Sequence, residues 1–203
     1  MNLASRKYEE EIPMTANSSR LEIRYIFLSA VIVAAAVLVL LSFGRSPICT
    51  CGLVRLWHGE VFSSENSQHI SDWYSPSHFI HGILFYGALA WLLRTVSIGV
   101  RLNIAVLIEA AWEIFENTDF IINRYREATI ALDYFGDSIL NSTSDIMFMM
   151  IGFFAAWRLP VWVSIVLVIS LEVLVAYVIR DNLTLNIIML LYPIDAIKMW
   201  QAG

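Results

Sequence analysis

The chain has 203 residues, of which 58% are hydrophobic and 15% are charged, and its mean hydropathy is +0.66. Soluble proteins are about 45–50% apolar and about 25% charged, so this composition excludes a soluble globular domain. The formal net charge of −5 also argues against a nucleic-acid-binding protein, because such proteins carry a basic surface. The composition therefore indicates a small multi-pass membrane protein.

Long apolar segments begin near the N-terminus. A membrane-spanning helix needs about 20 mostly apolar residues, and the segment 24–43 meets this requirement without an internal charge. We read it as an anchor rather than a cleaved signal peptide, because the preceding segment is long and contains Glu9, Glu10 and Glu11. Residues 1–22 are polar and lack an apolar period, so they are predicted to form a flexible cytoplasmic tail.

Four further apolar segments follow, at 78–94, 102–122, 138–157 and 160–179. The stretch 183–200 either crosses the membrane again or lies at its surface, because Pro193, Asp195 and Lys198 interrupt it. The sequence therefore predicts an all-α transmembrane bundle of five or six spans, forming one domain over 23–203. A modest excess of Lys and Arg places the N-terminus in the cytoplasm and the polar loop 45–77 on the outer side.

Polar residues gather at one side of the predicted bundle. With five spans, the segments 45–77, 123–137 and 180–186 fall on the same side of the membrane. Residues three, four or seven apart share a helix face, and three predicted spans carry polar faces that continue this cluster into the bilayer. The residues are His78 and His81; Glu109, Glu113 and Glu116; and Asp137, Asn141, Ser144 and Asp145.

These side chains require partners. An ionised group at the bilayer centre costs on the order of 2.5–3.5 kcal/mol, so the glutamates must be protonated, paired or metal-bound and must face protein or water. The predicted cytoplasmic halves, 83–93, 102–108 and 149–157, contain no Asp, Glu, His, Lys or Arg. The sequence therefore predicts a one-sided polar site in the outer half of the bilayer.

Three interpretations of this site stay open: a divalent metal centre, a metal-free catalytic or binding site, and a polar network that only ties helices together. The candidate metal ligands are His78, His81, Glu113, Glu116 and Asp137. The candidate catalytic residues are these five together with Asn141 and Asp145.

Other polar residues are candidates for substrate binding. Arg124 and Arg126 suit an anionic headgroup, since a guanidinium donates paired hydrogen bonds to phosphate; alternatively they neutralise carboxylates or anchor helix ends. His69 and Asp72 lie in a serine-rich loop, where they either assist acyl transfer or make ordinary turn and capping contacts. Asn117 is expected to orient the site.

Three more residues are of chemical interest. Cys49 and Cys51 would face an oxidising compartment, and a structural role and a soft-metal or redox role both stay open. Glu172 is an isolated charge in the segment 160–179, and we expect it to join the acidic cluster.

Several long motifs resemble an uncharacterised family of bacterial inner-membrane proteins typical of alphaproteobacteria, uncharacterised protein family three hundred and fourteen. The motifs include Cys49-Thr-Cys-Gly, Trp112-Glu-x-x-Glu-Asn-Thr, Asn123-Arg-Tyr-Arg and Arg180-Asp-Asn-Leu-Thr-Leu-Asn. The resemblance covers about residues 23–202. It implies a multi-pass membrane protein and carries over no activity, cofactor or catalytic residue.

The best functional hypothesis is an enzyme that acts on a lipid or lipid-linked phosphate or ester at the outer face of the inner membrane. The alternatives are a non-catalytic assembly or partner-binding protein and a proton-coupled transporter. Transport needs polar groups in both halves of the pathway, so the apolar inner halves argue against it. The expected partners are the lipid bilayer and a lipid substrate, with no nucleic acid, and the sequence indicates no oligomeric state.

Overall fold

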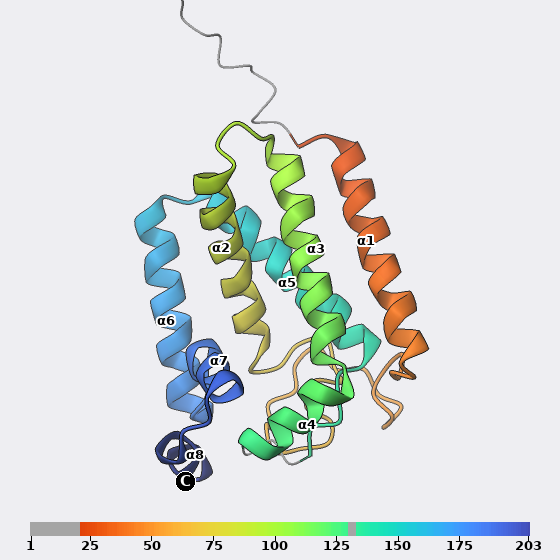
Figure 1. The fold of residues 1–203 in the computed structure, drawn as a ribbon, viewed down its shortest axis with the longest axis vertical. Coiled ribbons are helices and arrows are strands. Elements are labelled where there is room, and N and C mark those ends of the chain that lie inside the picture. The colour runs from red at the N-terminus through yellow and green to blue at the C-terminus, as the bar shows by residue number, and fades with distance from the viewer. Residues whose placement is uncertain (1–20, 130–132) are drawn as a thin grey trace, which may run out of the picture.

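A computed structural model describes residues 21–129 and 133–203, which form eight α-helices and no β-strand (Figure 1). The helices are α1 (Ile23–Ser42), α2 (Ser75–Leu92), α3 (Ile98–Glu116), α4 (Asp119–Ala128), α5 (Ile139–Arg158), α6 (Val161–Ile179), α7 (Leu183–Leu191) and α8 (Asp195–Ala202). The all-α prediction is confirmed for this part of the chain. The predicted tail at 1–22 lies almost entirely outside the described residues.

The bundle is built around α2, α3 and α5. The most extensive packing joins α2 to α5, and α1 packs along α3 (Figure 1). Leu102, Val106, Met149 and Phe153 form the centre of the core and have no exposed surface. The core thus lies in the half of the bundle where the predicted spans carry no charge.

Among the described residues, three helices, α1, α5 and α6, are long and apolar enough to cross a membrane, fewer than the predicted five or six. In α2 the apolar run is interrupted by His78 and His81, and in α3 by Glu109 and Glu113. Both α1 and α6 bury few residues inside the protein, so their apolar side chains face outward. These features are compatible with a protein embedded in a membrane.

The predicted span 102–122 and the stretch 183–200 are each broken into shorter helices. The segment 102–122 divides where α3 ends at Glu116 and α4 begins at Asp119, with the hydroxyl of Thr118 capping α4 by accepting from the Ile121 backbone N–H. The segment 183–200 divides around Pro193, which lacks a backbone donor and disfavours a helical residue before it. Helices of 9 and 8 residues are too short to cross a bilayer, so the sixth span is not formed.

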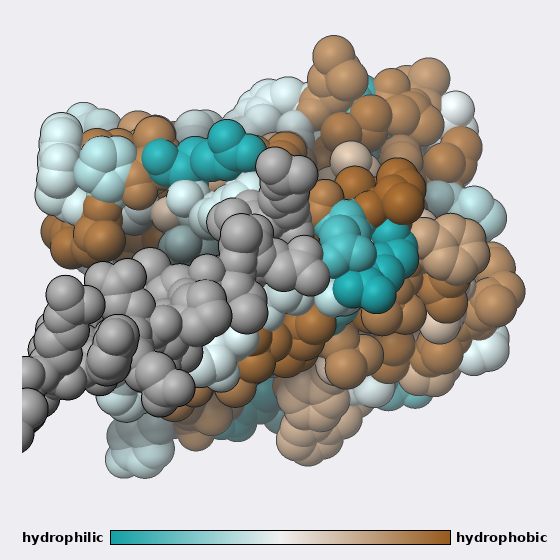
Figure 2. All heavy atoms as spheres, turned by 90° about the horizontal axis from the view of Figure 1, so that it is seen from above, coloured by the Kyte–Doolittle hydropathy of each residue, from teal (hydrophilic) through white to brown (hydrophobic). Residues whose placement is uncertain are grey.

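The two ends of the bundle differ. α1 and α3 begin, and α2 ends, at one end, whereas α4, α7, α8 and the loop between α1 and α2 lie at the other (Figure 1). The described residues of the three segments predicted to share one side therefore lie at the same end. Figure 2 shows the molecule from the end where α1 and α3 begin. Hydrophobic side chains cover much of its rim, with separate hydrophilic patches.

Candidate functional site

A cavity of about 400 Å³ is lined by residues of α2, α3, α4, α6, α7 and the loops at the polar end. Its polar lining residues include Tyr74, His78, His81, Glu109, Glu116, Tyr125, Tyr134, Asp181 and Asn186. Most of the remaining wall is apolar. Leu84, Ile108 and Ile187 line the cavity and are 44–51% exposed. The cavity therefore combines an accessible apolar wall with a buried polar cluster.

The centre of the polar cluster is a carboxylate shared by two imidazoles. His78 and His81 lie one turn apart on α2, and Glu109 on α3 is fully buried. The distances from Nδ1 of His78 and of His81 to Glu109 Oε1 are 2.7 and 3.0 Å. Because both Nδ1 atoms face this carboxylate, it orients both rings. Glu109 was recognised in the sequence as part of an acidic stripe but was not selected as a site residue.

Two further carboxylates lie behind His78. Its Nδ1 is 3.4 Å from Glu113 Oε1, and its Nε2 is 3.8 Å from Asp145 Oδ2. Glu113 is 0% and Asp145 4% exposed. Both oxygens of Glu113 and Oδ1 of Asp145 lack a hydrogen-bond partner among the described residues. A buried carboxylate without a donor is costly, so these atoms call for a proton or a bound cation.

Glu116, Asn117 and Asp137 continue the cluster toward the polar end. The side chain of Asn117 donates to Asp137 Oδ2 (2.9 Å) and accepts from the backbone N–H of Asp137 (2.7 Å). The hydroxyl of Tyr134 donates to Asp137 Oδ1 at 3.1 Å. Burial raises the pKa of Asp137 to about 6, because it penalises the charged form more than these hydrogen bonds favour it. Asn117 therefore holds the Asp137 carboxylate in place, and its role toward a substrate stays a prediction.

The cluster contains three overlapping groups of residues whose ligand atoms lie within 4.8 Å of one another. They are His78, His81 and Glu109; His78, Glu113 and Asp145; and Glu113, Glu116 and Asp137. The five predicted metal ligands are therefore brought into one neighbourhood, but not around a single point. The side chain of Asn141 donates to the backbone carbonyl of His69 at 2.9 Å and so holds the loop between α1 and α2.

Arg124 and Arg126 do not line the cavity. Arg124 Nε donates to the backbone carbonyl of Leu190 at 2.9 Å, and the Arg126 guanidinium lies 4.8 Å from the centre of the Phe135 ring. The break after α3 redirects α4, so that these side chains no longer follow the acidic face of α3. These contacts fit the anchoring of helix ends, and the binding of an anionic headgroup by the two arginines stays a prediction.

Asp72 is a buried capping residue. Its carboxylate accepts from the backbone N–H groups of Tyr74 (2.7 Å) and Ser67 (3.1 Å) just before α2. Burial raises its pKa. Since Asp72 does not line the cavity, its contacts correspond to the turn and capping interpretation.

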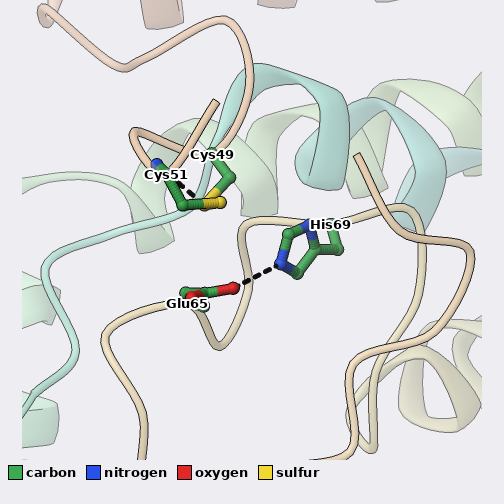
Figure 3. A group of neighbouring side chains, drawn as sticks. All are labelled: Cys49, Cys51, Glu65 and His69. Carbon is green, nitrogen blue, oxygen red and sulfur yellow. Dashed lines mark hydrogen bonds and ion pairs between the residues drawn. A yellow bond between two sulfur atoms is a disulfide. The ribbon is translucent and has the colours of Figure 1, made fainter. Parts of the chain in front are cut away.

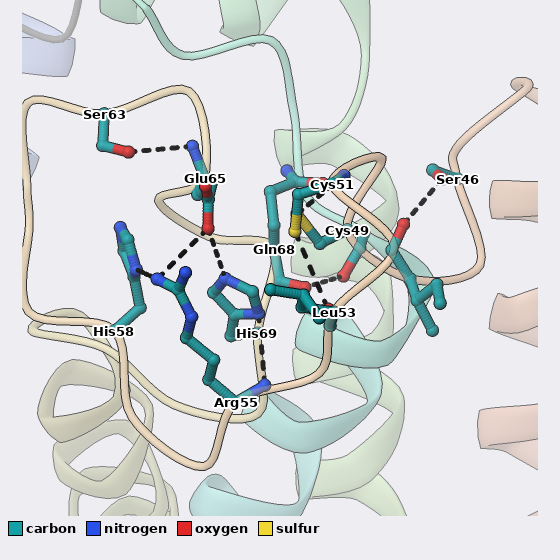
Figure 4. The surroundings of a disulfide bond; sticks show 12 residues. Ser46, Cys49, Cys51, Leu53, Arg55, His58, Ser63, Glu65, Gln68 and His69 are labelled. Atoms are coloured by element: carbon teal, nitrogen blue, oxygen red, sulfur yellow. Dashed lines mark hydrogen bonds and ion pairs between the residues drawn. A yellow bond between two sulfur atoms is a disulfide. The ribbon is translucent and has the colours of Figure 1, made fainter.

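His69 belongs to a separate group in the loop between α1 and α2. Its Nε2 is 3.1 Å from Glu65 Oε2, and Arg55 Nη1 pairs with the same oxygen at 3.2 Å (Figures 3 and 4). The hydrogen bond with His69 lowers the pKa of Glu65. Cys49 and Cys51 lie beside this group and are joined by a disulfide (Figure 3). Their sulfurs are therefore not thiolates, the form that binds metals.

Glu172 does not join the acidic cluster, so that prediction is wrong. Its carboxylate accepts from the backbone N–H groups of Leu183 (3.0 Å) and Thr184 (3.1 Å) and from the Thr184 hydroxyl. Free N–H groups and a partial positive charge mark the start of every helix, and here they attract this carboxylate to α7.

Several cavity residues were not singled out from the sequence. The Tyr74 hydroxyl donates to Asp181 Oδ2 at 3.2 Å, and the Tyr125 hydroxyl donates to Asn186 Oδ1 at 2.9 Å. Burial raises the pKa of Asp181 to about 6. The only sequence signal for these residues was their place in segments predicted to share one side of the membrane.

Comparison with known proteins places the chain in a family. The model described as "Protein of unknown function (DUF2585)" matches residues 40–203. A UPF0314 protein of Paracoccus denitrificans is 58% identical over 172 residues, 85% of this chain and 89% of the relative. A UPF0314 protein of Sinorhizobium fredii is 60% identical over 172 residues, 85% of this chain and 87% of that relative. A UPF0314 protein of Agrobacterium fabrum is 51% identical over 189 residues, 93% of this chain and 94% of that relative. No solved structure matches the chain. The resemblance to this family is thereby confirmed, and the chain belongs to the UPF0314 family of alphaproteobacterial proteins.

Proposed function

We propose that this protein is a multi-pass inner-membrane enzyme that acts on a lipid or lipid-linked phosphate or ester. The observation that carries the proposal is the cavity, whose lining combines accessible apolar side chains with a buried cluster of imidazoles and carboxylates. An amphiphile fits such a cavity, with its chain against Leu84, Ile108 and Ile187 and its polar group against His81 and Glu109.

The proposed topology has five crossing helices, α1, α2, α3, α5 and α6, with the N-terminus in the cytoplasm. The polar residues of α2 and α3 do not oppose this arrangement, because Glu109, Glu113 and His78 are buried against neighbouring helices rather than exposed to lipid. α2, α3 and α5 pack against one another, and α6 contacts α2 and α5. The cavity then lies in the outer half of the bilayer.

The proposed chemistry is hydrolysis. Water attacks the phosphorus or acyl carbon, a carboxylate accepts a proton from the water, and the bond to the leaving oxygen breaks as that oxygen takes up a proton. His81 suits the transfer of a proton to the leaving oxygen, since its ring lines the cavity and Glu109 holds its Nδ1. Glu116 lines the same cavity and is the proposed acceptor of the proton from the water.

The test is a comparison of membrane lipids between a deletion strain and its parent. We expect one lipid species to accumulate in the deletion strain. The wild-type gene and a Glu127→Gln control, which alters an exposed carboxylate on α4, should restore the parental profile. His81→Ala and Glu109→Gln should not restore it at equal membrane abundance. An unchanged lipid profile in the deletion strain, or full restoration by both site variants, would refute the proposed enzyme.

A further inference from the structure

We propose that His78, Glu113 and Asp145 bind a divalent cation of the Zn²⁺ or Mn²⁺ type. The three residues come from α2, α3 and α5, and their ligand atoms lie within 4.8 Å of one another. A site formed by three helices needs all of them in place, so metal binding would tie the centre of the bundle together. The binding of this ion does not rest on the proposed function.

The unpartnered oxygens are the first support. Both oxygens of Glu113 and Oδ1 of Asp145 are buried without a hydrogen-bond donor among the described residues. Buried carboxylate oxygens are almost always satisfied, by a donor, a water molecule or a cation. A carboxylate that is aimed at an imidazole and at a second carboxylate, with both oxygens unpartnered, has the geometry of a metal ligand.

The orientation of His78 is the second support. Its Nδ1 is held by Glu109 Oε1 at 2.7 Å, which leaves Nε2 on the side of Asp145. Metal-binding histidines usually present one ring nitrogen to the metal and donate from the other to a carboxylate, which fixes the tautomer and the ring orientation. Glu109 stands in the position of that carboxylate.

The charge of the cluster is the third support. Five carboxylates lie close together, and in the described part of the chain their ion pairs come from His78 and His81 alone. A divalent cation compensates the two carboxylates that bind it. One imidazole and two carboxylates suit Zn²⁺ or Mn²⁺ better than a soft cation such as Cu⁺, which prefers sulfur.

This site differs from the one expected from the sequence. Glu116 and Asp137 form a separate group with Glu113, and Asp137 already accepts hydrogen bonds from Asn117 and Tyr134. His81 is directed to Glu109. The metal therefore belongs on the α5 side of His78, next to Asp145.

The experiment measures Zn²⁺ and Mn²⁺ binding to the full-length protein in detergent, after chelation and removal of the chelator. Isothermal titration gives the stoichiometry and affinity, and elemental analysis gives the metal retained by the protein as purified. We expect one equivalent to bind. Glu113→Gln and Asp145→Asn should weaken binding at least about 100-fold, since each removes a ligand, while the exposed control Glu60→Gln should bind as the wild type does.

Glu116→Gln separates this assignment from the neighbouring group. Wild-type affinity in this variant supports the proposed ligands, whereas loss in Glu116→Gln with full binding in Asp145→Asn overturns them. If the wild-type protein does not bind one equivalent of metal, the proposal is overturned, whether or not the variants fold. If the protein binds metal but the deletion strain accumulates no lipid, the proposed enzyme is refuted and the metal site is not. If the deletion strain accumulates a lipid but the protein binds no metal, only the metal site is refuted.

Discussion

Gly82 on α2 and Gly152 on α5 allow these two helices to cross in direct backbone contact. A Cβ atom on Gly82 would collide with the backbone of Met149 and Phe153, and one on Gly152 would collide with the backbone of Phe79. The crossing lies about one turn beyond His78 on α2 and two turns beyond Asp145 on α5. The glycines therefore set the separation of these two side chains as well as the packing of the helices.

Replacing Gly82 by alanine should destabilise the protein. The obstacle is backbone, which no side-chain rotation can relieve, so we expect a loss of about 1–3 kcal/mol or more. Gly87, on the same helix, has nothing within 4 Å of a built Cβ, and Gly87→Ala is the matched control. Alanine favours a helix over glycine, so the control should be neutral or slightly stabilising. Thermal unfolding in detergent measures the stability of both variants. Equal melting temperatures for Gly82→Ala and Gly87→Ala would contradict the close crossing of the helices.

Helical periodicity recovered most of the site but not its centre. It placed His78 and His81 on one face of their helix and Glu109, Glu113 and Glu116 on another, and the structure brings these faces together. Periodicity defines a face within one helix and does not tell which residue of the neighbouring helix it meets. For this reason Glu109, which both imidazoles contact, was not selected.

Helix breaks and helix ends set the positions that spacing predicts least well. The interruption after α3 turns Arg124 away from the acidic face that it would have extended in a continuous helix. Glu172 was expected in the cluster because it is charged and isolated, but the start of α7 provides its partners. Both positions depend on where a helix ends or begins, which hydropathy and spacing specify poorly in an apolar segment.

Glu172→Ala should loosen α7. The variant removes the acceptor for the first N–H groups of this short helix, a loss comparable with that of a helix cap, about 0.5–2 kcal/mol. Hydrogen exchange at Leu183 and Thr184 should become faster, while exchange in the core of α3 should not change. Unchanged protection at both amides would mean that the carboxylate contributes nothing to α7.

Asp181 should make the stability of the protein depend on pH. Its folded pKa of about 6 lies above the ordinary value of 3.8, so the folded state prefers the protonated form. The contribution of protonated Asp181 to the free energy of unfolding is present below about pH 4 and is lost as the pH rises through about 6. This contribution is about 3 kcal/mol. Asp181→Asn cannot ionise and lacks this contribution.

The melting temperature of the wild type should therefore fall relative to that of Asp181→Asn between pH 4 and pH 7. Asp137 also has a raised pKa, but it is present in both proteins and cancels in the difference. A difference that stays constant over this range would show that Asp181 titrates normally.

The two cysteines offer a direct test of the proposed topology. They are the only cysteines in the sequence, and both lie in the loop between α1 and α2, with Cys51 exposed and Cys49 buried. In intact cells treated with a mild impermeant reductant, a membrane-impermeant maleimide should label Cys51 if this loop is outside. Cys51→Ser should abolish most of the labelling, because the remaining thiol is buried. Labelling only after the membrane is permeabilised would place the loop, and the cavity beside it, on the cytoplasmic side.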